Sequence, residues 1–325
     1  MNREQLMEQA RQSSLNKWAD AQRRALHEAV RNTPVGPAAA AAGLGTGSGG
    51  AISGIISMKW TDPSYAVGSL DEWNSFFDLL GAPEAFTSVT IDGDTTILSG
   101  TPGFNIINNV FSPGKAGNQY LVEFRDLTGC VNSVGDQAFA NCDNLTTAIL
   151  PAAKFIRNSA FIDCASLQFV NIDSATFIMD NAFAYCPLLE SISIPNVEVL
   201  GPYSFSYSGL LDITGPKVII IDNSAFTNCV DLESVSFPVA TTVEPYAFSN
   251  CTLLKNIYVP NCTNLGGSVG DNNVFYALNG TAGTAGTSGT INLTVDFSRS
   301  TCGTSGNPDG DITYVTGLGS NITYV

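Results

Sequence analysis

AFAYCPLLESISIP (residues 182–195) is one copy of a pattern that recurs through the middle of the chain. Its Phe183 belongs to a series of six phenylalanines, spaced by 22, 22, 22, 21 and 22 residues: Phe139, Phe161, Phe183, Phe205, Phe226 and Phe248. A fixed period in the twenties is typical of solenoids, in which each repeat forms one coil and buries its apolar residues against the neighbouring coils. The spacing therefore predicts an all-β solenoid with a period of about 22 residues.

Each repeat has further marks at fixed distances from its phenylalanine. The third residue after it is Ser208 in the fourth repeat and cysteine in the others, namely Cys142, Cys164, Cys186, Cys229 and Cys251. The sixth residue is leucine throughout: Leu145, Leu167, Leu189, Leu211, Leu232 and Leu254. The ninth and eleventh form apolar pairs such as Ile192 and Ile194, an alternation typical of a strand with one buried face. A second apolar column follows at Ile156, Ile178, Leu200, Ile221 and Val243. We expect each coil to contain a turn, a strand, a second turn and a short strand, with all these columns buried.

The pattern A-F-x-x-C-x-x-L-x-x-I-x-I-P resembles the BspA-like class of leucine-rich repeats. The resemblance covers about residues 121–265, less than half of the chain. It implies surface attachment or adhesion, and it implies no activity and no catalytic residue. We expect no cofactor.

Five segments are expected along the chain. Residues 1–33 are predicted to form an N-terminal docking helix, whose apolar stripe includes Met7 and Trp18 and whose basic residues include Arg23 and Arg24. Residues 34–57 are rich in Ala, Gly, Ser and Pro and are expected to be a flexible linker. Residues 58–120 are expected to cap the first coil, residues 121–265 to form the solenoid, and residues 266–325 to form a C-terminal β cap.

Charge and composition exclude several functions. The net charge is −15, while residues 1–33 carry six basic and four acidic residues, so that the remainder carries −17. Nonspecific nucleic-acid binding by the repeats is therefore not expected. Residues 1–33 lack the apolar core of a signal peptide, and no apolar run is long enough to span a bilayer, so we expect neither a signal peptide nor membrane insertion.

No catalytic constellation is expected either. The single histidine, His27, lies outside the repeats, so a Ser-His-Asp or Cys-His site is not predicted there. Cysteines that recur once per coil are expected to be buried and reduced, since their spacing is not that of metal ligands. Asp92-Gly93-Asp94 and Asp309-Gly310-Asp311 leave Ca²⁺ binding open, although Asp-Gly is also typical of tight turns.

Two sets of outward-facing residues are candidate surfaces. On the first strand of each repeat we expect a binding surface for a protein or a sugar, formed by Phe169, Asn171, Ser191, Ser193, Ser234, Ser236, Asn256 and Tyr258. On the second strand we expect an apolar stripe formed by Phe155, Phe177, Val199 and Ile220. Contiguous apolar surface is typical of an interface, so this stripe predicts a homo-oligomer, a neighbouring protein or cover by the chain's own flanks.

The sequence favours a non-enzymatic protein of a virion surface: a head or tail fibre, a capsid decoration protein or a host-attachment module. In this hypothesis residues 1–33 dock into other virion proteins, and the acidic solenoid faces a host-surface glycan or protein. The alternative is a bacterial or protist cell-surface adhesin of the BspA type. An intracellular scaffold is a third possibility, and an enzyme is disfavoured.

Overall fold

The structure is a computed structural model. It describes residues 54–61, 86–92, 95–100, 104–106, 118–262, 264–265, 292–295 and 321–324. The chain divides into two compact units, Met1–Gly50 and Ala51–Val325, and every described residue belongs to the second. The expected docking helix, with Met7, Trp18, Arg23 and Arg24, therefore lies outside the described residues, as do Gly93, Asp94 and the Asp309–Asp311 motif.

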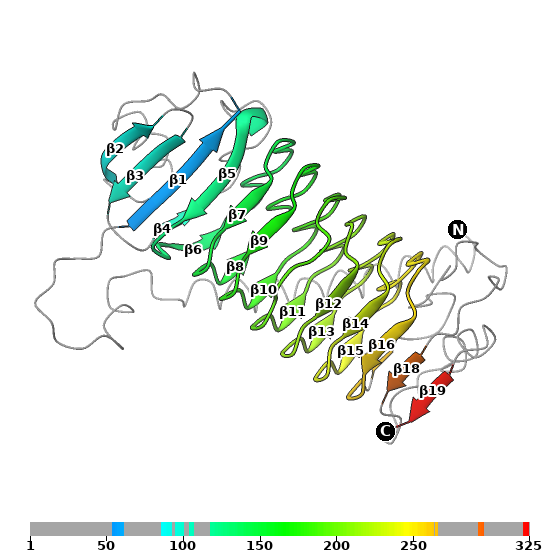
Figure 1. The fold of residues 1–325 in the computed structure, drawn as a ribbon. Helices are drawn as coiled ribbons and strands as arrows, with labels where there is room; N and C mark the ends of the chain where they lie inside the picture. Colours follow the sequence, from blue (N-terminus) through cyan, green and yellow to red (C-terminus); the bar gives the residue numbers. More distant parts are fainter. Residues whose placement is uncertain are drawn as a thin grey trace, which may run out of the picture. The chain divides into compact units, whose positions relative to one another are not determined.

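Stacked coils form the centre of the second unit (Figure 1). The first strands of the coils are β5 (Leu121–Asp126), β7 (Thr147–Ile149), β9 (Phe169–Asn171), β12 (Asp212–Thr214), β14 (Ser234–Ser236) and β16 (Asn256–Val259). The second strands are β6 (Val131–Val134), β8 (Phe155–Ile156), β10 (Phe177–Ile178), β11 (Val199–Leu200), β13 (Ile220–Ile221), β15 (Thr242–Val243) and β17 (Asn264–Leu265). Strands of successive coils pair in parallel, which confirms the all-β solenoid. Among the described residues there is no α-helix, and the only helical turn is the 3-10 helix η3 (Asn118–Tyr120).

Antiparallel strands extend the first coil on its N-terminal side. β2 (Phe86–Asp92) and β3 (Thr95–Gly100) form an antiparallel pair, and β1 (Gly54–Trp60) lies between β3 and β5 in the same sheet. β4 (Phe104–Ile106) pairs in parallel with β6. The sequence did not predict β1, which overlaps the last four residues, 54–57, of the expected linker. Residues 34–53 of that linker lie outside the described residues.

The stack also continues on the C-terminal side. β18 (Asn292–Val295) pairs in parallel with β16, and β19 (Asn321–Tyr324) pairs in parallel with β18. The C-terminal strands therefore extend the sheet of the first strands, because they repeat its alternation even though the spacing of 22 residues has ended.

A column of stacked aromatic rings runs through the core. The six repeat phenylalanines are 0 % exposed, and successive rings lie 4.9–5.5 Å apart with interplanar angles of 3–9°. Phe124 closes the column at the N-terminal end with an edge contact to Phe139 at 5.2 Å. Parallel in-register pairing places the same residue type at the same place in every coil, which is why the rings stack.

The cysteine column satisfies backbone carbonyl groups inside this core. The thiols of Cys164, Cys186, Cys229 and Cys251 donate hydrogen bonds of 3.0–3.2 Å to the carbonyl oxygen of the phenylalanine one coil earlier. In the fourth coil the Ser208 hydroxyl lies 3.3 Å from the Cys229 sulfur. The seven cysteines among the described residues are buried with free thiols, as expected, because a small side chain with a weak donor fits this position.

The turn around each phenylalanine contains two residues with positive φ. They stand two residues before and two residues after the phenylalanine, with φ between 54 and 60°: Gln137, Asn141, Ser159, Asp163, Asn181, Tyr185, Tyr203, Tyr207, Ser224, Asn228, Tyr246 and Asn250. Asparagine and aspartate tolerate this left-handed region better than most other residues, whereas tyrosine gains nothing there. The two positions turn the backbone so that the phenylalanine between them points into the core.

The fourth coil corrects one prediction. Leu211 is 44 % exposed, and Leu210 occupies the buried leucine column instead, so the missing residue of this repeat falls between Ser208 and Leu210. The shorter turn passes so close to the third coil that a Cβ on Gly209 would lie 2.1 Å from the carbonyl oxygen of Pro187. A glycine is therefore required where the turn is shortened.

We predict that truncation of one ring in the column strongly destabilises the solenoid. Phe183→Ala removes two stacking contacts and leaves a cavity, so the free energy of unfolding should fall by about 3–5 kcal/mol. Phe169→Ala is the matched control, because Phe169 is 53 % exposed and its loss should cost less than about 1 kcal/mol. Urea unfolding followed by circular dichroism measures both, and equal losses would show that the ring column is not the dominant stabilising contact.

Candidate binding surfaces

The outward side of the first strands, here called the strand face, contains all eight residues of the predicted binding surface. Backbone pairing aligns Phe169 with Thr147, and Asn256 with Ser234, in one column. A second column aligns Asn171 with Ile149, and Tyr258 with Ser236. Phe169 and Tyr258 are the most exposed aromatic side chains of this face, at 53 % and 45 %. Ser191, Ser193 and Asn256 are exposed, and Asn171, Ser234 and Ser236 are half-buried.

The fourth coil adds two residues to the strand face that sequence reasoning missed. Asp212 and Thr214 are exposed and pair in register with Ser234 and Ser236. They were missed because the deletion was placed after Leu211. The polar–apolar–polar alternation of Asp212, Ile213 and Thr214 is the sequence signal that would have located them.

The strand face is interrupted between the third and fourth coils. β9 ends one sheet and β12 begins another, and Ser193 is joined to Asn171 only by an isolated parallel bridge. Ser191 and Ser193 therefore lie on a segment without a full strand. The second strands, by contrast, form one continuous eight-stranded sheet.

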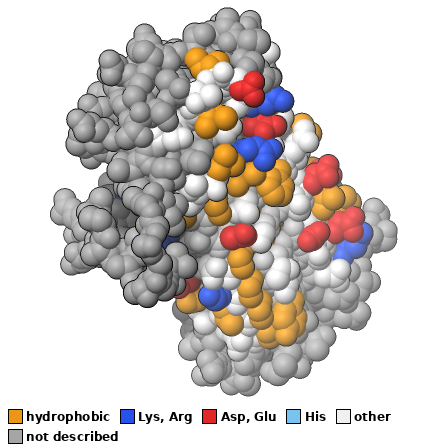
Figure 2. Space-filling view, turned by 60° about the vertical axis from the view of Figure 1, so that its left-hand side comes forward, with side chains coloured by type: hydrophobic (Ala, Val, Ile, Leu, Met, Phe, Trp, Pro, Cys, Tyr) orange, Lys and Arg blue, Asp and Glu red, His pale blue; other side chains and the backbone are white. Residues whose placement is uncertain are grey.

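Acidic, basic and apolar side chains mix on the outer surface of the described residues (Figure 2). Two ion pairs involve residues in or directly before the first strands: Arg125 with Glu123 at 2.7 Å in β5, and Lys255, before β16, with Glu233, before β14, at 3.5 Å. Asn171 donates a hydrogen bond of 3.2 Å to the Asp173 carboxylate. Ion pairs that reach solvent in this way contribute little to stability. Hydroxyl and amide groups make up most of the surface between the two aromatic residues.

The four side chains of the apolar stripe on the second strands are only partly exposed to solvent. Phe155 is 9 % exposed, and Phe177, Val199 and Ile220 are half-buried. The Phe155 and Phe177 rings stack at 5.7 Å, and the four residues pair in register across β8, β10, β11 and β13. A homo-oligomer formed through this stripe stays a prediction.

Two kinds of buried polar side chain, an aspartate and the cysteines, have structural roles. The Asp126 carboxylate accepts hydrogen bonds from the backbone amides of Cys130 and Val131 at 2.9 and 2.8 Å, and so holds the turn from β5 to β6. Burial, with Asp126 beside it, raises the pKa of the Cys130 thiol to about 12. Burial likewise raises the pKa of the Cys186 and Cys229 thiols to about 12, so these groups are poor nucleophiles.

One carboxyl group is strongly perturbed on the side of the coils that carries the phenylalanine turns. Burial raises the pKa of Asp222 to about 7, and the negative charges of Glu244 and Asp180 add to the increase. The pKa of Glu244 is also raised by burial. Within the described residues no group of three His, Cys, Asp or Glu side chains is arranged to hold a metal ion.

The sequence comparison identifies the repeats. Residues 118–229 and 176–277 match the family described as BspA type leucine rich repeat region, in six copies. The repeat region belongs to the BspA type of leucine-rich repeats. Such repeats are suited to protein–protein interaction and are typically non-catalytic.

Two solved leucine-rich repeat proteins are similar to the chain in fold. A leucine-rich repeat protein from Bacteroides ovatus is 22 % identical, with a TM-score of 0.37 over 55 % of this chain and 51 % of that protein. The leucine-rich repeat protein of T. pallidum is 21 % identical, with a TM-score of 0.37 over 55 % of this chain and 81 % of that protein. The chain thus spans about half the length of the first of these. No curated protein matches. Among the described residues, none lies in a helix long and apolar enough to cross a membrane.

We predict that Asp222 makes the stability of the BspA-type solenoid fall as the pH rises. Its pKa is raised from 3.8 to about 7 in the folded chain, so folding takes up a proton between these values. The associated stabilisation is present below about pH 4 and is lost as the pH rises through about 7. Asp222→Asn should flatten the decline between pH 4 and pH 8, whereas the exposed control Asp212→Asn should not. Thermal unfolding at a series of pH values measures this, and parallel curves for wild type and Asp222→Asn would contradict it.

Proposed function

We propose that the chain is a non-enzymatic binding protein whose strand face holds a partner protein. The observation that carries the proposal is the pair of exposed aromatic side chains, Phe169 and Tyr258, at 53 % and 45 %, on a face whose other outward residues are mostly hydroxyl and amide groups. Rigid aromatic residues provide contact area at a low cost in conformational entropy, and small polar side chains adapt their hydrogen bonds to a partner.

The rigidity of the solenoid supports this function. On the strand face β7, β14 and β16 are each paired in parallel on both sides, and the inward residues of the strands are buried in the core. A surface that is already ordered loses little conformational entropy when a partner binds. The neutral columns also favour contact with a protein over contact with a polyanion.

The test compares two double variants of the full chain. Phe169→Ser with Tyr258→Ser removes both aromatic residues of the strand face, and Val239→Ser with Leu253→Ser removes two side chains of similar exposure, 40 % and 45 %, outside it. On an array of cell-surface proteins and glycans, we expect protein ligands whose affinity falls at least about tenfold in the first variant. Binding that is equally insensitive to both variants would refute the proposal, and a response confined to glycans would replace the protein partner with a sugar.

We further propose that residues 1–33 attach the chain to a virion, with the solenoid as a fibre, decoration or host-attachment module. The support is the change of charge, from net +2 over residues 1–33 to −17 over the rest, together with the Ala- and Gly-rich segment between them. A basic docking segment and an acidic projecting part suit two different surroundings.

Deletion of residues 1–33 tests the attachment. The shortened chain should keep the circular dichroism spectrum of a folded β protein, and mass spectrometry of purified particles should no longer detect it. Normal incorporation would refute the proposal. Recovery of the full chain with cell envelopes rather than particles would favour the alternative, a cell-surface adhesin.

A further inference from the structure

Three of the four positive-φ positions in the third and fourth coils are tyrosines, and the fourth is Asn181. Tyr185 follows Phe183 by two residues, and Tyr203 and Tyr207 flank Phe205, with φ of 58, 54 and 57°. Apart from Tyr246, the corresponding positions of the other coils hold Asn, Asp, Ser or Gln. These smaller polar residues suit the left-handed backbone, and a tyrosine does not gain from it.

Burial does not explain the three tyrosines either. Tyr185, Tyr203 and Tyr207 are 45, 43 and 46 % exposed, so much of each ring faces solvent. They form what we call the tyrosine patch. Large side chains that neither suit their backbone position nor fill the core are candidates for a contact with something outside the chain.

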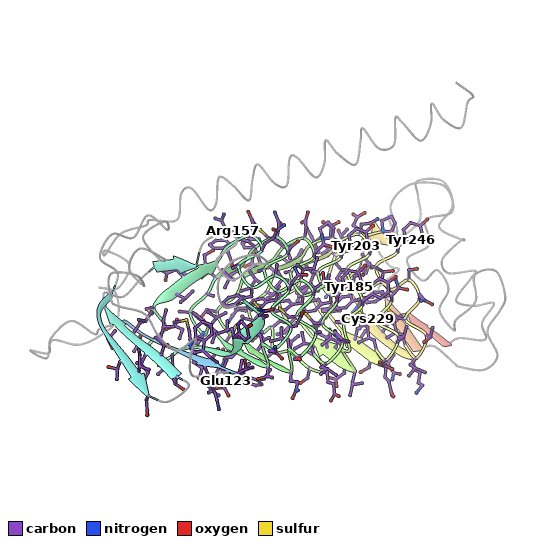
Figure 3. All side chains as sticks on the ribbon, turned by 90° about the horizontal axis from the view of Figure 1, so that it is seen from above. Glu123, Arg157, Tyr185, Tyr203, Cys229 and Tyr246 are labelled. Carbon is purple, nitrogen blue, oxygen red and sulfur yellow. The ribbon has the colours of Figure 1, made fainter. Side chains whose placement is uncertain are left out.

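The geometry of the patch presents an aromatic platform. The Tyr185 and Tyr207 rings stack across two coils with centroids 4.7 Å apart and an interplanar angle of 11°. Tyr203 precedes the same buried phenylalanine that Tyr207 follows, and Figure 3 shows Tyr203 nearer than Tyr185 to the edge that also carries Arg157 and Tyr246. The patch therefore lies on the turn side of the coils, away from the strand face.

The surroundings of the patch are acidic. Asp163 occupies the position of Tyr185 one coil earlier, and its amide bonds to the carbonyl of Ala184 at 3.0 Å. Asp180 precedes Asn181, whose amide donates a hydrogen bond of 2.9 Å to the carbonyl oxygen of Pro202. Pro202 is the residue before Tyr203, so Asp180 lies near this end of the patch. From four residues before to five residues after each repeat phenylalanine, the described turns contain one basic residue, Arg157, and seven acidic ones: Asp136, Asp143, Asp163, Asp180, Asp222, Asp231 and Glu244.

This negative charge is poorly compensated within the turns. Burial and the neighbouring Asp143 raise the pKa of Asp163, and burial with Glu244 and Asp180 raises that of Asp222. Carboxylates that lie close enough for the charge of one to raise the pKa of a neighbour favour a cation in their vicinity. The tyrosine rings and the carboxylates around them therefore both favour a cationic ligand.

We propose that the tyrosine patch and its acidic border bind an arginine-containing segment of a partner protein. A guanidinium group stacks on a tyrosine face and donates hydrogen bonds in its plane to carboxylates beside the ring. A nucleic acid is repelled by the same charge, and a neutral sugar makes no use of it. This surface is separate from the strand face and does not depend on the function proposed for that face.

The test uses fluorescein-labelled octa-arginine and the full chain in a buffer of low ionic strength. Tyr203→Asn with Tyr207→Asn places at both positions a residue that suits their φ, so the melting temperature should not fall. Fluorescence anisotropy should show binding of octa-arginine to the wild type and roughly tenfold weaker binding to the double variant. Tyr258→Asn is the matched control, because Tyr258 is 45 % exposed on the strand face and its replacement should leave the affinity unchanged.

A second probe separates the patch from general attraction to an acidic chain. Octalysine carries the same charge but stacks less well on aromatic rings, so the wild type should prefer octa-arginine and the double variant should lose that preference. Absence of binding to the wild type, or equal affinities of the wild type and the double variant, would overturn the proposal. Displacement of octa-arginine by a synthetic peptide of residues 1–33 would also overturn it, by assigning the patch to the chain's own basic segment.

Discussion

Parallel stacking at one fixed spacing is the constraint on which the rest of this structure depends. The buried phenylalanine rings lie 4.9–5.5 Å apart, close to the spacing of paired strands, so one ring per coil satisfies both the aromatic contacts and the backbone ladder. The other columns of equivalent residues, buried and exposed, have the same spacing because each contributes one residue per coil. The thiol of one coil reaches the carbonyl group of the coil before it, and an outward residue of one strand lies beside its counterpart on the next. The same constraint explains why a single coil has no stable core of its own.

The two candidate surfaces differ in how the fold presents them. The strand face is built from alternate residues of short parallel strands, so its composition changes without disturbing the core. The turn side presents residues at backbone positions with a conformational preference, and a tyrosine at such a position departs from that preference. A tyrosine at such a position is a stronger indication of a binding site than an exposed residue on a strand, because the fold gives no reason for the tyrosine. Both surfaces belong to a scaffold whose described cysteines are buried and whose type of repeat is typically non-catalytic.

The repeating parts of the structure could be predicted from the sequence. Strand β1, which lies outside the repeats, and the repeat that lacks one residue could not be predicted correctly. The columns of phenylalanine and cysteine, and the buried residues of the second strands, were found because each recurs about once in 22 residues. Leu211 was misplaced because the position of a deletion within a turn is set by contact between coils, which Gly209 and Pro187 reveal only in three dimensions. β1 was missed because an antiparallel partner, β3, lies about 40 residues further along the chain and leaves no local signal. The tyrosine patch was overlooked because sequence spacing does not reveal the sign of φ, although the Asn and Asp at the equivalent positions were visible.

The one-residue deletion in the fourth repeat has a mechanical consequence. It coincides with a break between two sheets on the strand face, while the second strands remain one eight-stranded sheet on another side of the coils. Resistance to bending is therefore expected to differ around the solenoid. The sheet of the second strands is uninterrupted, whereas the sheet of the first strands is broken beside Ser191 and Ser193. A force that opens the break between the first-strand sheets separates few paired backbone groups. The same force applied to the second strands must break the hydrogen bonds of paired strands. We therefore expect the solenoid to bend most easily in the direction that opens the strand face, at the coil from which one residue is missing.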